Sequence, residues 1–174
     1  INEAYKMVRD SDIRNSQIVS DVESCIANGR TPLVLTKFKD HAAYLYEKLN
    51  GSADHIFLLQ GGRSTKERDL IRKQMKEVPE NETIVLVAIG QYIGEGFNYP
   101  RLDTMMLTTP IAWQGNVEQY VGRLHRDFEG KQDVIIYDYV DSHIRVLERM
   151  YHKRLRAYKK IGYEICMTLT DKKQ

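Results

Sequence analysis

Five short apolar segments recur along the chain, and each is a continuous run of hydrophobic residues without polar alternation. Strands that are covered on both faces have this continuous pattern, whereas strands with one wet face alternate. We therefore predict buried β-strands over residues 32–36, 55–59, 83–88, 103–107 and 133–137.

Between these runs, apolar residues recur three or four positions apart, which is the spacing of one face of a helix. One such segment begins with a capping box, Ser64 followed by Glu67, and ends at Pro79. Another has Asp40 as its candidate N-cap and stops at Asn50-Gly51. The pattern predicts helices over residues 17–27, 40–49, 65–78, 116–124 and 142–160.

Strands and helices alternate with a period of roughly 25 to 30 residues, the length of a βαβ unit. Such units favour right-handed crossovers and a mainly parallel sheet, here of about six strands, with helices on both faces. Since no Pro/Gly/Ser-rich linker interrupts the chain, the pattern indicates one α/β domain over residues 15–165. Residues 1–14 are predicted to be a lead-in and residues 166–174 a tail.

The composition excludes several classes of protein. With 174 residues, 42% hydrophobic and 29% charged, the chain is neither disordered nor collagen-like, and no apolar run is long enough to span a bilayer. The only cysteines, Cys25 and Cys166, share no CxxC spacing, so reduced thiols in the cytoplasm are the simplest interpretation. The histidines are scattered, and no metal site is expected.

A net charge of +2 does not by itself indicate a nucleic-acid partner. Cations are concentrated between His143 and Lys160, where seven Lys or Arg accompany the single acid Glu148. A solvated helix face and a binding surface explain this run equally well.

Candidate chemistry lies in the loops that follow the strands, where α/β sheets place their sites. On a helix, Arg123 and Arg126 are three positions apart and Gln119 precedes Arg123 by four, so all three share a face. Two guanidinium forks on one face suit the charge of a transferring phosphoryl group. Gly122 weakens a helix, which suggests that something packs close to its backbone.

These residues match Q-x-x-G-R-x-x-R, and a G-E-G-F-N-x-P stretch precedes them at Gly94–Pro100. Together they resemble motifs VI and V of the second RecA-like domain of superfamily 2 helicases. Motif IV corresponds to residues 33–38 and the glycine-bearing IVa loop to Gly61-Gly62, so the resemblance covers about residues 16–160. Within the superfamily, the chain looks most like bacterial DEAD/DEAH-type or type III restriction-like helicases.

The resemblance implies a three-layer RecA-like fold of the P-loop NTPase type and a role for each motif. Arg126, the arginine finger, and Arg123 would reach the γ-phosphate of an ATP that the preceding N-terminal RecA-like domain holds with Mg²⁺. The other residues expected at this cleft are Gln119, Gly122, Glu95, Gly96 and Asn98. Those expected to face the backbone of DNA (or RNA) are Thr36, Lys37, Gly61, Gly62, Arg63, Ile89 and Gly90.

Two residues depart from the family pattern, and two motifs are missing. Motif V usually has an acid where this chain has Asn98 and a threonine where it has Ile89, which cannot donate to a phosphate. The sequence contains neither a G-x-x-x-x-G-K-[ST] phosphate loop nor a D-E-x-H or D-E-x-D motif to hold Mg²⁺. By itself, the chain is therefore expected not to hydrolyse ATP.

The favoured hypothesis is the C-terminal motor domain of an ATP-dependent helicase or translocase, with DNA preferred on the finer resemblance and no membrane partner. The alternative is a non-catalytic RecA-like module that binds nucleic acid or docks a protein. Gln119, Arg123 and Arg126 favour the motor, whereas Asn98 and Ile89 favour the module. A nucleotide-sugar enzyme on a similar sheet is a third possibility, but it leaves Q-x-x-G-R-x-x-R unexplained.

Overall fold

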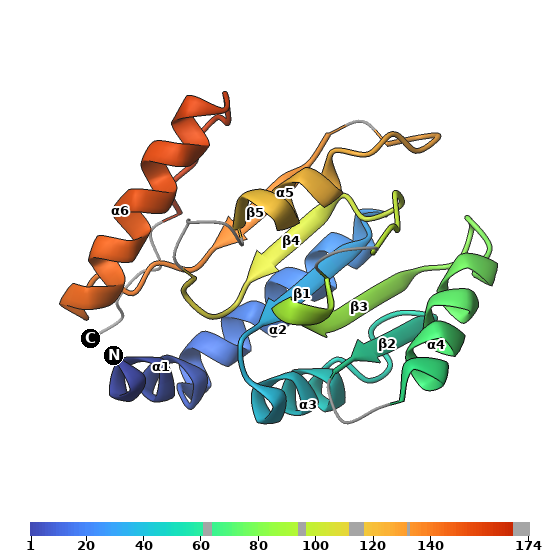
Figure 1. Ribbon diagram of the computed structural model, residues 1–174, viewed down its shortest axis with the longest axis horizontal. Helices are drawn as coiled ribbons and strands as arrows, with labels where there is room; N and C mark the ends of the chain where they lie inside the picture. The colour runs from blue at the N-terminus through green and yellow to red at the C-terminus, as the bar shows by residue number, and fades with distance from the viewer. Residues whose placement is uncertain (61–63, 94–96, 112–116, 132, 169–174) are drawn as a thin grey trace.

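The computed structural model describes residues 1–60, 64–93, 97–111, 117–131 and 133–168. At its centre lies a parallel sheet in the order β2-β3-β1-β4-β5 (Figure 1). The described residues contain five strands, not the predicted six or so: β1 (Pro32–Thr36), β2 (His55–Leu59), β3 (Ile84–Ile89), β4 (Thr104–Leu107) and β5 (Ile135–Asp138).

Helices connect the strands as the βαβ pattern predicts. In chain order they are α1 (Asn2–Arg9), α2 (Asp12–Ala27), α3 (Lys39–Lys48), α4 (Thr65–Glu77), the short 3-10 helix η1 (Gly90–Tyr92), α5 (Glu118–Leu124) and α6 (Arg145–Lys160).

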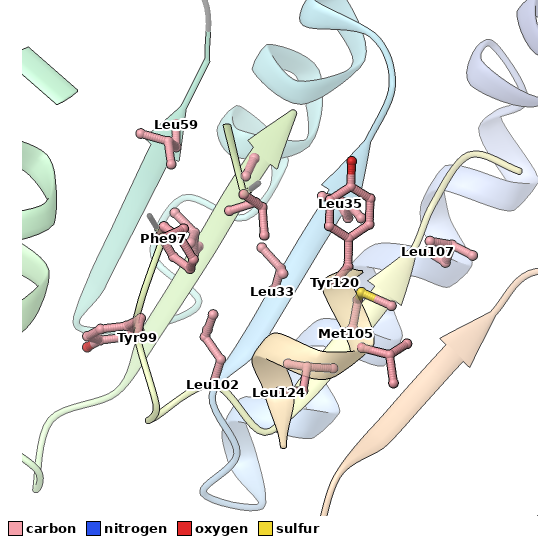
Figure 2. Close-up of a cluster of buried hydrophobic side chains, with 14 of the residues drawn as sticks. Leu33, Leu35, Leu59, Phe97, Tyr99, Leu102, Met105, Leu107, Tyr120 and Leu124 are labelled. Atoms are coloured by element: carbon pink, nitrogen blue, oxygen red, sulfur yellow. The ribbon is translucent and has the colours of Figure 1, made fainter. Parts of the chain in front are cut away.

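Both faces of the sheet are covered, which accounts for the continuous apolar runs. Leu33 and Leu35 of β1 point to the face on which α4 and α5 pack, with Tyr120 and Leu124 of α5 above them (Figure 2). Val34, between them, points to the opposite face and packs with residues of α2 and α3. Alternate residues of one strand thus enter two separate hydrophobic cores, and the molecule has three layers.

The ends of the helices test the predicted caps. Ser64 caps α4, and its hydroxyl accepts the backbone N–H of Glu67, so the predicted cap is confirmed. The predicted N-cap at Asp40 is wrong, because α3 begins at Lys39 and Asp40 lies in its first turn. A carboxylate in the first turn still interacts favourably with the helix dipole. The last helix begins at Arg145, three residues later than predicted.

The lead-in predicted for residues 1–14 contains a helix. Ala4, Tyr5 and Val8 of α1 form a small third core with Leu147 of α6. The first and last helices of the chain, α1 and α6, are therefore neighbours, as Figure 1 also shows.

Candidate functional site

The carboxyl ends of the strands bring the predicted loops to one edge of the sheet. Thr36 and Ile89 are register partners at the ends of β1 and β3, so the loops that carry Lys37 and Gly90 start side by side. Ile89 is partly buried against the core of the α2 and α3 face. The predicted residues Gly61, Gly62, Arg63, Glu95 and Gly96 lie outside the described residues.

The structure joins the two stretches identified as motifs V and VI. Arg126 donates from Nη1 to Oδ1 of Asn98 over 2.9 Å, and both side chains are exposed. The amide at position 98, a departure from the family pattern, therefore serves as an acceptor for the candidate finger.

The two arginines do not share a helix face as predicted. Helix α5 ends at Leu124 and His125 is its C-cap, so Arg126 lies beyond the helix. Arg123 and Gln119, which remain on the helix, are half-buried, whereas Arg126 is exposed. A lysine donates hydrogen bonds to carbonyl groups at the end of this helix and just beyond it.

That lysine is Lys131, to which no motif or spacing in the sequence points. Its ammonium donates to the carbonyl oxygens of Pro100 at 3.0 Å and of Arg126 at 2.7 Å, and also to that of Leu124. Burial lowers the pKa of this ammonium. A cation at the C-terminal end of a helix also interacts favourably with the helix dipole. Lys131 thus holds the backbone of Arg126 and, through the carbonyl of Pro100, links it to the loop that contains Asn98.

Two glycines in the motifs have different structural reasons. A Cβ added to Gly90 would lie 2.6 Å from the hydroxyl oxygen of Tyr120, so any larger residue at this position would have to displace the ring of Tyr120 on α5. Gly122 has nothing within 4 Å of such a Cβ. The prediction that something packs against Gly122 is therefore wrong within the described residues of this domain, and the helix backbone at that point is open to the outside.

The loop after β1 uses most of its polar groups internally. The side chain of Thr36 is fully buried, and its hydroxyl oxygen accepts the N–H of Phe38 at 3.3 Å. The N–H of Lys37 donates to Oγ1 of Thr109 at 2.9 Å. The ammonium of Lys37 is exposed and lies 4.2 Å from the ring centre of Tyr5, a cation–π contact. Among these groups, the Lys37 ammonium is the one that faces solvent.

The buried ring of His41 holds this loop through a hydrogen bond with Thr36. Asn15 donates its amide to the carbonyl of Arg9 at 2.8 Å, so its oxygen faces Nε2 of His41, 2.8 Å away, and that nitrogen carries the proton. Nδ1 then accepts the hydroxyl proton of Thr36 over 2.8 Å. Burial, together with the charges of Arg14 and Arg9, lowers the pKa of His41 from 6.5 to about 4, so the ring is neutral at pH 7.

Two buried ion pairs brace the same edge. Arg14 of α2 binds both carboxylate oxygens of Asp141, at 2.9 and 3.0 Å, and also donates to the carbonyl of Thr108. Arg154 of α6 binds both oxygens of Asp138 at 2.8 and 2.9 Å, with only 1% of its side chain exposed. Arg154 is therefore not part of the solvated basic face that the charge run suggested.

The sequence offered no signal for these braces or for His41. The members of each pair are far apart in the chain or have no distinctive spacing, and a lone polar residue in an apolar segment does not reveal its partner. Among the described residues, no group of His, Cys, Asp or Glu is arranged to hold a metal ion. None of the helices in that part of the chain has the length and hydropathy to cross a membrane.

Comparison with known proteins finds relatives of this chain among viral proteins. The chain is 26% identical over 139 residues to transcript termination protein A18 of Fowlpox virus, covering 79% of this chain and 29% of the relative's length. The chain therefore spans less than a third of that protein.

Two solved structures share the fold. T4 UvsW matches with a TM-score of 0.72 at 17% identity, over 91% of this chain and 35% of that one. Yeast (S. cerevisiae) Dbp5 bound to RNA and ADP BeF3 matches with a TM-score of 0.58 at 15% identity, over 86% and 36%. The model of the helicase conserved C-terminal domain matches residues 16–128, a span that contains the Arg126–Asn98 contact. The chain belongs to the helicase conserved C-terminal domain family, with the RecA-like fold of helicase C-terminal domains.

Proposed function

We propose that this chain is the C-terminal motor domain of an ATP-dependent nucleic-acid helicase or translocase. The observation that carries the proposal is the way Arg126 is held. Its exposed guanidinium is oriented by a hydrogen bond to Asn98, and its backbone carbonyl accepts a hydrogen bond from Lys131. An exposed but positioned cation suits a finger that reaches an ATP bound by another domain. Such a group stabilises the charge of the transferring phosphoryl group and can raise the rate about 10³-fold or more.

In this proposal, ATP and Mg²⁺ are held by the N-terminal RecA-like domain of the same polypeptide. The sequence contains no phosphate loop, and the described residues offer no carboxylate cluster for Mg²⁺. What this chain supplies is Arg126, Arg123 and Gln119 at the edge of the cleft. The open backbone at Gly122 allows the other domain to approach α5 closely. Glu95 and Gly96 are proposed to line the same cleft.

The nucleic-acid track is proposed to run along the strand ends. The backbone N–H groups of Lys37 and Phe38 already have acceptors inside the domain. The exposed ammonium of Lys37 is therefore the donor of this loop that is proposed to contact a phosphate. Gly61, Gly62, Arg63, Ile89 and Gly90 complete the proposed track. The yeast Dbp5 structure, whose chain holds RNA and ADP BeF3, supports the pairing of nucleotide and nucleic acid on this fold. DNA stays the preferred partner on the finer resemblance to bacterial DEAD/DEAH-type or type III-like helicases.

The test compares chemistry with binding in the full-length protein. Arg126→Ala is expected to reduce the ATP turnover number by about two to three orders of magnitude while nucleic-acid affinity changes less than about threefold. Arg123→Ala is expected to lower turnover similarly and to weaken ATP binding as well. Arg101→Ala is the matched control, because that arginine donates to the carbonyl groups of Val78, Pro79, Glu80 and Glu82 and is not placed at the proposed ATP cleft.

Near-normal turnover in the Arg123→Ala/Arg126→Ala double variant would contradict the proposal. If instead the unmodified full-length protein binds nucleic acid but hydrolyses no ATP, the chain is the non-catalytic RecA-like module.

A further inference from the structure

One side of α6 is entirely basic. At about 100° per residue, five positions of this helix fall within an arc of about 80°. Every α6 residue in that arc is a Lys or Arg, and all five are exposed; we call them the α6 basic stripe: Arg145, Arg149, Lys153, Arg156 and Lys160.

The stripe lies opposite the buried face of the same helix. Leu147, Tyr151, Arg154 and Tyr158 are the buried residues of α6, and they centre about 170° around the helix from the stripe. Arg154 holds Asp138 with two hydrogen bonds and donates to the carbonyl of Ile111 at 3.0 Å. Tyr158 donates to the same carboxylate at 2.9 Å. These contacts fix α6 on the domain and keep the stripe turned to solvent.

Nothing in the described part of the chain neutralises the stripe. The one acid on the helix, Glu148, lies outside the arc, and its carboxylate is 3.8 Å from His152. Neighbouring stripe residues are three or four positions apart, so their like charges repel one another and weaken the helix. An ordinary solvated helix mixes charges: on α4, Arg72 pairs with Asp69 at 3.4 Å. Binding of a polyanion would relieve the repulsion among these cations that exists in the free protein.

The geometry of the stripe fits a stiff polyanion. Its cations are spaced about 5–6 Å apart along a straight line of about 22 Å. A nucleic-acid duplex is stiff over about 150 base pairs, so binding it along a rigid helix costs little ordering entropy. No apolar residue lies within the arc, which argues against insertion into a lipid surface.

We propose that the α6 basic stripe binds the phosphate backbone of a nucleic-acid duplex, outside the track at the strand ends. The choice of a nucleic acid as the polyanion rests on the proposed function. Five cations without base-reading side chains neutralise phosphates but read no sequence. The contact holds duplex near the motor independently of the ATP cycle.

The test is a titration of the 174-residue chain with a labelled 20-base-pair DNA duplex at several salt concentrations. Arg149→Gln/Lys153→Gln/Arg156→Gln is expected to lower duplex affinity at least tenfold at low salt. It should also reduce the slope of log affinity against log salt by about 2–3, since each lost phosphate contact removes about 0.9. The fold of each variant is checked by circular dichroism.

The matched control is Lys66→Gln/Lys73→Gln/Lys76→Gln on α4, which removes the same charge from an exposed helix that also carries acids. The control should retain most of the slope. The proposal is overturned if the α4 variant loses as much as the α6 variant, or if the α6 variant keeps the slope of the unmodified chain. Loss of polyglutamate binding with intact duplex binding would also overturn it, because the partner would then be an acidic protein.

Failure of this proposal is distinguishable from failure of the proposed function. Arg126→Ala is expected to leave the duplex slope unchanged, because Arg126 is not in the stripe. A negative result for α6 leaves the turnover prediction for Arg126 standing.

Discussion

Acid should loosen the domain through His41. The perturbation is a change from pH 7 to pH 5. In the folded protein the ring is buried, and its pKa lies at about 4, against 6.5 in the unfolded chain. Between these values the unfolded chain binds a proton that the folded protein does not, so stability falls as the pH falls. The contribution is complete above pH 6.5 and is lost progressively down to about pH 4.

The size of the effect follows from that difference in pKa. One pH unit within the window is worth about 1.4 kcal/mol, and because the window opens only below pH 6.5, the step from pH 7 to pH 5 costs about 2 kcal/mol. For a domain whose whole stability is about 5–15 kcal/mol, this is a large fraction. The exposed carboxylate of Asp10 acts against the shift but is a smaller influence than burial, Arg14 and Arg9.

The assay is urea unfolding of the isolated chain at pH 7 and pH 5, followed by circular dichroism. His41→Gln removes the titrating group while retaining an amide that can donate to Asn15. The unmodified chain should lose about 2 kcal/mol more between the two pH values than the variant does. If both lose the same free energy, the neutral, buried state assigned to His41 is wrong.

Two further substitutions test the packing of α5 and the lysine that holds the backbone of Arg126. Gly90→Ala should destabilise the chain by about 1–3 kcal/mol, because its Cβ would collide with the hydroxyl of Tyr120, and adding Tyr120→Phe should recover part of the loss in thermal unfolding. Lys131→Met leaves three carbonyl groups without their donor, so it should cost about 1–2 kcal/mol of stability and lower the turnover number of the full-length protein more than it changes the KM for ATP. Unchanged turnover with lowered stability would reduce Lys131 to a purely structural role.

The strands were predictable because both faces of the sheet are buried. Residues 32–36 and 55–59 agree with β1 and β2 at both ends, and the other three strands begin one or two residues later than predicted. Local chemistry also predicted the start of α4, since the capping box lies within four residues. Patterns that depend on neighbours in the chain were therefore readable from the sequence.

Contacts between distant residues were not readable in the same way. Helix spacing puts Arg154 on the same face of α6 as Tyr151 and Tyr158, but it does not reveal that the partner of this arginine is Asp138. Lys131 lies in a polar turn, and its function depends on where the carbonyls of Pro100 and Leu124 fall in space. The expectation that Arg123 and Arg126 share a helix face failed because α5 ends at Leu124 and Arg126 lies beyond it.

The central claim is that this chain is half of an ATPase and supplies its arginine finger to a nucleotide held elsewhere. The most direct test measures steady-state ATP turnover, with nucleic acid present, for three proteins: the isolated 174-residue chain, the full-length protein and full-length Arg126→Ala. We predict turnover in the unmodified full-length protein alone, with the variant reduced by about two orders of magnitude or more. Hydrolysis by the purified isolated chain that disappears in its own Arg126→Ala variant would contradict the claim.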